Sequence, residues 1–505
     1  MQQNQLPYNC LTHLDQISQQ LGTQNKIAVI DNTNSITYSE LYTKAKRFGC
    51  SLLNCNIKHQ EHIIICLEDS IDFIVCFLGS IYAGIIPVVI NPNLSNSEIH
   101  QIVVKSPANN VICSKSRAND FCQKEWNLIL IPDVITGNSV DRFIGQQYNT
   151  KIEPTDTYEN DDAFIYCTSG TTGHIKLVVH SQKSICGTGL QYGTSVISLN
   201  KNDVVFSAAK LSHAYGLGNS ISIPFVHGCT VVLESSLATP ETIVKLIETN
   251  KVTTFCGVPR HFTSLLNTSR QYSLDTLKVC LSAGESLPQK VGKDFTNRYK
   301  CVIINAIGST EILGFALSTR SDDIAYGSTG TVVDGCQVKL MDDYGNEVKQ
   351  GQLGELFVHS EYSSKKYWND ESSTQYTFID GWIKTNDMYM VNTNGHYVHK
   401  GRKNDCMKVN GLYVSLTGLE KDLYEVDSIL DAAVVFVENK YGLNKIELHI
   451  VLKDNFNEDI EYANIQQHFN KHELLSNRPF TIKIIDALPR TQSGKIKKYV
   501  LLNRD

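Results

Sequence analysis

The 505-residue sequence lacks several features that would place it in a specialised class of protein. It has no long run of like charge, and its formal net charge is −6 at pH 7, which argues against a general binder of nucleic acid or of membrane surfaces. Its fifteen cysteines are scattered singly, without a CxxC pair or a Cys/His cluster at zinc spacing. We therefore expect reduced thiols, most of them small core residues, in a cytoplasmic protein.

We also expect no membrane anchor from the sequence. The N-terminal stretch MQQNQLPYNC has neither a basic region nor an apolar run, so we expect no signal peptide. The most apolar stretch, 73–90, has 18 residues and carries Gly79, Gly84 and Pro87, which puts it at the lower limit for a membrane span. We predict a buried helix, a turn and then a strand at these positions.

Apolar runs alternate with helical periods over the first 300 residues. Strands are predicted at 62–68, 85–91, 109–114 and 128–133, and again at 203–209, 229–235, 252–259, 277–284 and 301–308. Helical stretches such as 40–54 and 95–106 accompany the first set. This alternation is typical of parallel sheets with helices on both faces. After residue 325, short strands between Gly, Asn and Asp turns predict antiparallel structure, and the chain from about residue 405 mixes helices with strands.

One polar stretch, YCTSGTTGHIK at 166–176, directly follows an apolar run. Its glycines permit positive φ and allow backbone N–H groups to converge as an anion-binding nest, to which hydroxyls and a lysine add donors. It differs from the common P-loop, because no glycine precedes its lysine and no hydroxyl residue follows. Alone it also fits a Gly/Thr-rich surface turn. The candidate phosphate contacts are Thr168, Ser169, Gly170, Thr171, Thr172, Gly173 and Lys176.

Three further pieces lie downstream. NAIGSTE ends an apolar strand, where α/β sheets bind ligands, so its Glu311 is a candidate Mg²⁺ ligand. Asp387 and Arg402 flank a predicted hairpin, where an acid and a base could grip a ribose. PRTQSGKIKK places Lys495 on a flexible Gly/Ser turn. Each piece alone is weak, because a lone carboxylate is more often structural than catalytic.

In this order and spacing the pieces resemble the adenylate-forming superfamily, which includes acyl-CoA synthetases, luciferases and the adenylation domains of peptide synthetases. The resemblance covers essentially the whole chain. It matches the phosphate loop at 167–176, the aromatic gate at 211–218, the magnesium motif at 308–311, the ribose motif and hinge at 385–387 and 401–405, and the catalytic-lysine motif at 489–498.

The resemblance implies an α/β fold with two domains. A large N-terminal AMP-binding domain, residues 1–403, would contain two doubly wound sheets and a small β-barrel. A small, mobile α+β domain, residues 404–505, would close over it as a lid. The small domain would swing on a hinge during the reaction, a kind of motion that gates many enzymes.

The resemblance also implies ATP-dependent ligase chemistry. A carboxylate is a poor electrophile, and its attack on the α-phosphate of ATP gives an acyl-adenylate, from which a thiol then displaces AMP. Charge gathers at phosphorus, so the site needs Mg²⁺, backbone donors and a mobile cation. Lys495 would bridge the carboxylate and ATP, Glu311 would hold Mg²⁺, and Asp387 with Arg402 would bind the ribose. Lys408 and Gly411 would border the thiol path. The nucleotide would further contact Gly284, Asn305, Ala306, Ile307, Gly308, Ser309 and Thr310.

Four residues depart from the family's pattern. Ile175 and Leu177 replace a proline and a glycine in the phosphate loop, and Asn404 occupies the hinge, where Asp or Lys is usual. Asn386 replaces a glycine before Asp387, and asparagine tolerates the left-handed conformation that such a turn requires. None of these changes removes a candidate catalytic group.

Several stretches resemble the benzoate and anthranilate CoA-ligase branch of the superfamily. Aryl relatives commonly have histidine where this chain has Gly314, so the missing ring frees volume for a larger or differently substituted acid. His213 stands at the gate, either selecting the acid or only closing over ATP, and we favour the second role. The acyl pocket would be lined by His213, Ala214, Tyr215, Gly257, Gly284, Gly308, Ile312, Leu313 and Gly314.

Rival functions remain at this stage. The gate region HAYGLGNS has no acid to meet an α-ammonium group, which argues against an α-amino acid but leaves β-amino and aminoaryl acids open. The acceptor is CoA or the phosphopantetheine arm of a carrier protein. A luciferase-like oxygenase has no marker, and a non-enzymatic scaffold would not need Lys495, Glu311 and Lys176. We expect a carboxylic acid, ATP and a thiol as partners, and a homodimer as the assembly.

Overall fold

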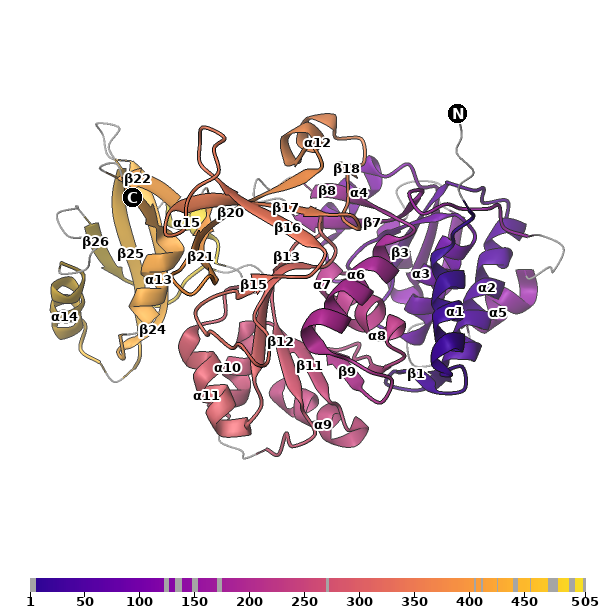
Figure 1. The fold of residues 1–505 in the computed structure, drawn as a ribbon, viewed down its shortest axis with the longest axis horizontal. Coiled ribbons are helices and arrows are strands. Elements are labelled where there is room, and N and C mark those ends of the chain that lie inside the picture. The colour runs from indigo at the N-terminus through magenta and orange to yellow at the C-terminus, as the bar shows by residue number, and fades with distance from the viewer. Residues whose placement is uncertain are drawn as a thin grey trace. The chain divides into compact units, whose positions relative to one another are not determined.

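A computed structural model describes residues 6–121, 127–131, 139–147, 153–169, 175–268, 272–403, 406–409, 412–424, 426–438, 444–454, 456–470, 480–489 and 496–502. The chain divides into two compact units (Figure 1). Unit 1 comprises Met1–Lys339, Phe357–Thr385 and Asn394–Tyr397, and unit 2 comprises Leu340–Leu356, Asn386–Thr393 and Val398–Asp505. The boundary between residues 403 and 404 stays a prediction. Across the described ranges, none of the helices has the length and apolar character that crossing a membrane requires.

Unit 1 contains a seven-stranded sheet in the order β18-β8-β7-β4-β3-β5-β6. Strands β7, β4, β3, β5 and β6 run parallel, as predicted from the alternating pattern. The chain moves from β3 to β4 on one side and then crosses to β5 on the other side of β3. The strands are β3 (His62–Cys66), β4 (Ile86–Val89), β5 (Asn110–Ser114), β6 (Asn127–Ile131), β7 (Asp162–Ser169), β8 (Ile175–Ser181) and β18 (Lys366–Tyr367).

Helices cover both faces of this sheet. Along β3, Ile63 and Ile65 pack into one core cluster, and Ile64 and Cys66 pack into another. A strand buried on both faces reads as a continuous apolar run, which is why the sequence signal at 62–68 is strong. Helices α2 (Tyr38–Asn54) and α3 (Ile71–Tyr82) lie side by side on one face (Figure 1), and α4 (Asn96–Lys105) lies on the other.

The apolar stretch 73–90 is buried within unit 1. Ser70 caps α3 by accepting a hydrogen bond from the Phe73 N–H, Gly84 adopts a φ of 69° beyond its end, and β4 follows. The helix, turn and strand predicted for this stretch are therefore confirmed. Leu78 and Ile81 have no exposed surface, so the apolar character serves the core.

A nine-stranded sheet has the order β15-β14-β13-β12-β11-β9-β10-β1-β2. Its central strands run parallel, and the N-terminal strand β1 joins it beside β10, with Val29 opposite Val231. The strands are β1 (Ile27–Ile30), β2 (Ser35–Thr37), β9 (Val204–Ser207), β10 (Thr230–Val232), β11 (Thr254–Gly257), β12 (Val279–Ser282), β13 (Ile303–Gly308), β14 (Phe315–Ser318) and β15 (Thr331–Val332).

This second sheet is also buried on both faces. On one face, Phe255 and Cys280 pack with residues of α9 (Pro240–Asn250), α10 (Pro259–Asn267) and α11 (Gln289–Tyr299). On the other, Cys256 and Leu281 pack near α6 (Ser184–Tyr192). The two large sheets confirm the predicted α/β class, and they bring the carboxyl ends of β11, β12 and β13 next to one another.

Antiparallel and mixed sheets follow in the last third of the chain. A five-stranded sheet lies in the part of the chain where short strands were predicted after residue 325. It contains β16 (Cys336–Met341), β17 (Leu353–Ser360), β19 (Phe378–Ile379), β20 (Trp382–Val391) and β21 (Tyr397–Arg402). The end of unit 2 has an α+β core in which Leu419, Leu448 and Phe469 pack together. Its elements are β22 (Cys406–Val409), β23 (Leu412–Ser415), α13 (Leu416–Tyr424), β24 (Ile429–Glu438), β25 (Asn444–Leu452), α14 (Glu458–Asn470), β26 (Phe480–Ile484) and α15 (Lys498–Leu501).

Candidate active site

The candidate phosphate loop connects two antiparallel strands of the first sheet. Thr168 pairs with Lys176, and Ser169 with Ile175, so β7 and β8 bring the two ends of the loop together. Lys176 leaves the loop with its ammonium 4.8 Å from the centre of the Tyr367 ring. The predicted contacts Gly170, Thr171, Thr172 and Gly173 lie outside the described residues.

The carboxyl ends of three neighbouring strands supply the second group of predicted residues. Gly257 on β11 lies opposite Ser282 on β12, and Ser282 lies opposite Asn305 on β13. Gly284, just beyond β12, has a φ of 84°, a conformation that favours glycine. The structure therefore brings Gly257, Gly284 and Asn305 to one edge of the sheet, where α/β proteins bind ligands.

Asn305 is held in place by hydrogen bonds. Its side-chain amide donates to the Ser328 carbonyl over 2.8 Å, and its backbone N–H donates to the Thr319 hydroxyl over 2.8 Å. The residue is 7% exposed. Its amide oxygen has no such partner among the described contacts, so this oxygen can face a ligand. The contact of Asn305 with adenine stays a prediction.

A tight turn follows β13 and carries Glu311. At Gly308 a β-carbon would lie 2.1 Å from the Gly314 carbonyl oxygen, so only glycine fits there. Ser309 accepts hydrogen bonds from Ile312 and Leu313, and Leu313 is forced to a φ of 64°, which is uncommon for a branched residue. The strained turn places Ile312 and Leu313 in the protein interior, each 3% exposed.

Both the backbone and the side chain of Glu311 are held by hydrogen bonds. Its backbone carbonyl accepts a hydrogen bond from Ser364 N–H over 2.8 Å, and its Oε1 accepts one from the Tyr367 hydroxyl over 2.7 Å. The described residues contain no group of three His, Cys, Asp or Glu side chains that could hold a metal ion. A single carboxylate still fits Mg²⁺, because this ion is commonly bound by one or two carboxylates together with substrate phosphates.

The gate motif is anchored where it begins. Leu211 donates its N–H to Asp69 over 2.9 Å, and its carbonyl accepts from the Tyr166 hydroxyl over 2.6 Å. Burial raises the pKa of Asp69 to about 7. His213 follows on the surface, with Nε2 3.2 Å from the Asn91 side-chain amide. Tyr166 of β7 and Asp69, which follows β3, thus position the start of the gate.

Tyr215 ties the gate to the second sheet. Its hydroxyl lies 2.9 Å from the Gly257 carbonyl and 3.1 Å from the Leu281 carbonyl, and burial raises its pKa well above the ordinary value. The residue lies in α7 (Ala214–Leu217), beside Ala214, which is 9% exposed, and α7 passes directly into a π-helix at Gly218–Ser222. Segments of π-helix are rare in proteins, but those that occur are often found at functional sites.

Gly314 lies against α6. A β-carbon there would be 3.3 Å from Thr188 Cβ and 3.4 Å from its methyl carbon. The Thr188 hydroxyl is engaged elsewhere, because it donates to the Ser184 carbonyl over 2.7 Å and lies 2.9 Å from the Ser222 hydroxyl. The wall beside Gly314 is therefore a methyl group. Sequence reasoning missed Thr188, because nothing in its local pattern sets it apart.

The candidate ribose pair is in contact within unit 2. Asp387 on β20 lies 3.0 Å from Arg402 Nε and 3.2 Å from His399 Nε2, and it is 5% exposed. Asn386 has a φ of 59°, so asparagine does adopt the left-handed turn predicted for it. His399, which lies on β21 together with Arg402, was not predicted.

Little of the predicted catalytic-lysine machinery falls within the described part of the chain. Lys408 lies on β22, opposite Tyr413 on β23. Lys495, Gly411 and the hinge residue Asn404 are outside the described residues. Their roles stay predictions.

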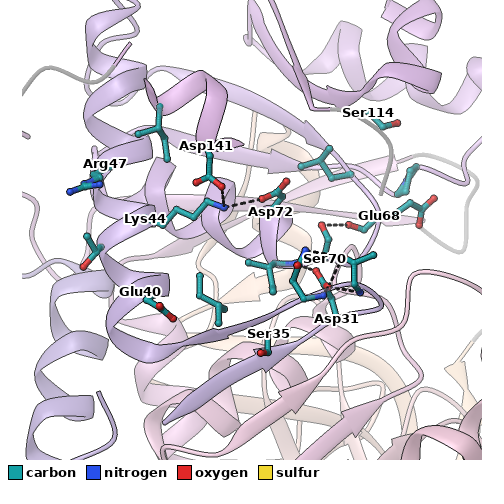
Figure 2. A pocket seen from close by; sticks show the side chains of 18 of the residues that line it. Asp31, Ser35, Glu40, Lys44, Arg47, Glu68, Ser70, Asp72, Ser114 and Asp141 are labelled. Atoms are coloured by element: carbon teal, nitrogen blue, oxygen red, sulfur yellow. Dashed lines mark hydrogen bonds and ion pairs between the residues drawn. The ribbon is translucent and has the colours of Figure 1, made fainter. Parts of the chain in front are cut away.

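A separate pocket of about 720 Å³ opens in unit 1, at the carboxyl ends of β3 and β5 and the starts of α2 and α3 (Figure 2). None of the predicted site residues lines it. Lys44 is shared there between Asp72 and Asp141, at 3.6 and 3.1 Å, and carboxylates outnumber cations in the wall. An acid-rich wall repels phosphate, so this pocket does not suit ATP.

Comparisons with known proteins agree with the motifs. Residues 18–368 match the family described as AMP-binding enzyme. The chain is 33% identical over 490 residues to a benzoate–CoA ligase of Thauera aromatica, covering 95% of this chain and 93% of that protein. It is similar to the solved structure of a benzoate CoA ligase from Burkholderia xenovorans LB400, with a TM-score of 0.88, 32% identity, and 98% and 100% of the two chains covered.

A second solved structure has the same fold. The anthranilate CoA ligase in complex with anthranoyl-AMP superposes with a TM-score of 0.89 at 27% identity, covering 98% of this chain and 97% of that chain. The match to the family spans more than half of the present sequence, and the similarity to the benzoate–CoA ligase extends over nearly all of it. The chain therefore belongs to the family of AMP-binding enzymes, and it is similar to benzoate and anthranilate CoA ligases.

Proposed function

We propose that this protein is an AMP-forming ligase that joins an aryl carboxylic acid to CoA. The acid attacks the α-phosphate of ATP to give an aryl-adenylate and pyrophosphate, and the thiol of CoA then displaces AMP. The observation that carries this proposal is the meeting of the β11, β12 and β13 ends with the Tyr215 gate. The names of the similar proteins support an aryl acid.

The apolar residues at these strand ends suit an aromatic ring. Ile312 and Leu313 present buried aliphatic surface, and Gly257 and Gly284 leave room for a flat group to approach the backbone. Tyr215 closes this region with a ring that its hydrogen bonds hold still. Binding pockets of this kind are mostly apolar with a few placed polar groups. In this proposal His213, on the outside, closes over the nucleotide.

The polar residues divide the nucleotide among them. Lys176 contacts the phosphates, residues 305–310 border the adenine and phosphates, and Asp387 with Arg402 binds the ribose hydroxyls. Glu311 holds Mg²⁺, which when bound neutralises charge that develops on the phosphates. Lys495 supplies the cation that brings the acid carboxylate to the α-phosphate, and Lys408 borders the path of the thiol.

Gly314 narrows the choice of acid. The space that a side chain would occupy faces the Thr188 methyl group at 3.4 Å, while the Thr188 hydroxyl is already bonded. A ring substituent directed at this position would therefore meet an apolar surface. We expect a methyl- or halogen-substituted benzoate to be used better than the hydroxyl-substituted acid of the same pattern.

Acid-dependent exchange of labelled pyrophosphate into ATP tests the first half of the reaction. Benzoate, its methyl, chloro, hydroxy and amino derivatives, cinnamates, β-amino acids and fatty acids are compared, and each is then supplied with CoA. Exchange with an aryl acid together with an aryl-CoA product is the expected result. Exchange without a CoA product would instead favour the phosphopantetheine arm of a carrier protein as acceptor.

The matched variant for this experiment is Lys495→Ala. It removes the cation proposed to bring the two substrates together, so acid-dependent exchange should fall by several orders of magnitude. Thioester formation from chemically prepared aryl-adenylate should persist, because that step does not need this lysine. Exchange at the wild-type rate in the variant would refute the proposed mechanism.

A further inference from the structure

Tyr367 connects two motifs that lie far apart in the sequence. It sits on the short strand β18, where it pairs with Val178 of β8, and it is 5% exposed. Its backbone N–H donates to the Thr374 hydroxyl over 3.0 Å, which ties it to the helix α12 (Glu371–Thr377). The Phe378 ring lies 5.2 Å from its own ring. The side chain is therefore held from several sides.

The first contact of Tyr367 is with Glu311. The hydroxyl donates to Oε1 over 2.7 Å, and Ser364, three residues earlier, donates its N–H to the Glu311 carbonyl. Burial, followed by the nearby Glu311 charge, raises the pKa of Tyr367, so the phenol stays protonated and acts as a donor. One short segment thus fixes both the backbone and the carboxylate of the candidate Mg²⁺ ligand.

The second contact is with Lys176. Its ammonium lies 4.8 Å from the centre of the Tyr367 ring, within the range of a cation–π interaction. No salt bridge joins Lys176 to Glu311 in the described part of the chain, although both side chains contact the same tyrosine. The ring face holds the cation and the hydroxyl holds the anion, so the two opposite charges stay separate.

We propose that Tyr367 is a positioning residue that keeps Lys176 and Glu311 apart and aimed at different parts of the ATP–Mg²⁺ complex. This inference rests on the proposed function of the same site. Without the tyrosine, the ammonium and the carboxylate are free to pair with each other, and each would then have to be released before it could bind a phosphate or a cation. Tyr367 acts through these two groups and takes no part in bond making.

Two substitutions separate the two contacts. Tyr367→Phe keeps the ring under Lys176 and removes the donor to Glu311, whereas Tyr367→Leu removes both. Tyr299→Phe is the matched control, because the hydroxyl of Tyr299, at the end of α11, is also buried and donates to one carbonyl, that of Leu265 in α10, at 3.0 Å. All three variants are compared with wild type by thermal melting before the kinetic measurements.

The measurements are the Mg²⁺ concentration for half-maximal pyrophosphate exchange and the KM for ATP at saturating Mg²⁺. Loss of a hydrogen bond to a charged group predicts about a tenfold rise in the half-maximal Mg²⁺ concentration for Tyr367→Phe. Tyr367→Leu should raise the KM for ATP about tenfold as well. Thioester formation from prepared aryl-adenylate and CoA should change less than about twofold in both, because that step uses neither group, and Tyr299→Phe should match wild type.

Unchanged Mg²⁺ dependence in Tyr367→Phe would overturn the inference, and so would an equal loss in exchange and in thioester formation, which indicates a structural role only. If Tyr367→Leu does not fold, Tyr367→Phe still decides the Glu311 contact. Failure of wild type to exchange with any acid would count against the proposed function instead. In that case calorimetric titration of ATP with and without Mg²⁺ tests Tyr367, because it needs no acid substrate.

Discussion

Replacing Tyr215 with phenylalanine removes a single oxygen from the gate. In the structure that hydroxyl is shared between the Gly257 and Leu281 carbonyls, at 2.9 and 3.1 Å. Because a phenol has one proton, it donates to one carbonyl at a time and satisfies the two in turn. The substitution leaves both acceptors without this donor at the ends of β11 and β12, while the ring itself still fills its space.

The size of the effect follows from burial. A buried acceptor that loses its partner costs about 1 to 3 kcal/mol, and both Gly257 and Leu281 are buried. We expect the free energy of unfolding to fall by about 1 to 2 kcal/mol. We also expect the KM for the aryl acid to rise. Each 1.4 kcal/mol of this loss that weakens binding of the acid raises the KM by at most about tenfold.

Urea denaturation measures the first quantity, and pyrophosphate exchange at varied acid concentration measures the second. Tyr299→Phe is again the control, because it removes a comparable hydrogen bond outside the gate. It should lose stability without a change in the KM for the acid. A Tyr215→Phe protein with wild-type stability and a wild-type KM would refute the anchoring role of the hydroxyl, and equal KM values in the two variants would refute its link to the acid.

Three further outcomes are expected. Burial lowers the pKa of the His180 imidazole from 6.5 to about 3. Below pH 6.5 the unfolded chain therefore binds a proton that the folded protein excludes. Because of this residue, the free energy of unfolding should fall by about 1 kcal/mol between pH 7 and 5.5. In urea titrations His180→Phe should lose correspondingly less, and equal losses would contradict the reasoning. Gly308→Ala places a β-carbon 2.1 Å from the Gly314 carbonyl oxygen and should reduce exchange more than about a hundredfold (over 2.7 kcal/mol), whereas Gly145→Ala, which meets no atom within 4 Å, should not; similar rates in both would refute the tight turn. Gly314→His should lower kcat/KM for chloro- and methylbenzoates more than for benzoate, and a uniform loss across the acids would show that Thr188 does not border the ring.

Much of the sheet structure could be predicted because buried parallel strands leave a strong signal. The runs at 62–68 and 277–284 are apolar on both faces, and the structure has β3 and β12 there. The periodicity of a strand does not indicate which strand it pairs with. Residues 27–30 join the second sheet beside β10, and no local pattern distinguishes that choice from pairing within the first sheet.

The residues of the candidate site also differ in whether the sequence alone could place them. Gly257, Gly284 and Asn305 could be placed at strand ends from the sequence, since a strand end is a local property. Tyr367, His399 and Thr188 could not be placed, because each reaches the site through a partner strand or helix. The KYWND stretch around Tyr367 offers only an aromatic residue beside polar ones, a pattern that many surface turns share.

The pairing of β1 with β10 has a consequence for how the protein is made. Val29 leaves the ribosome about 200 residues before Val231, the residue it must lie beside, and at ordinary synthesis rates of about 5–20 residues per second this wait lasts roughly ten seconds or more. During that time the strands β3 to β8 of the seven-stranded sheet can assemble, while the strand at 27–30 keeps an unpaired apolar edge. A nascent chain arrested before residue 230 would thus expose a surface for chaperones, and removal of the first 30 residues would damage the nine-stranded sheet, which contains β1, more than the seven-stranded sheet.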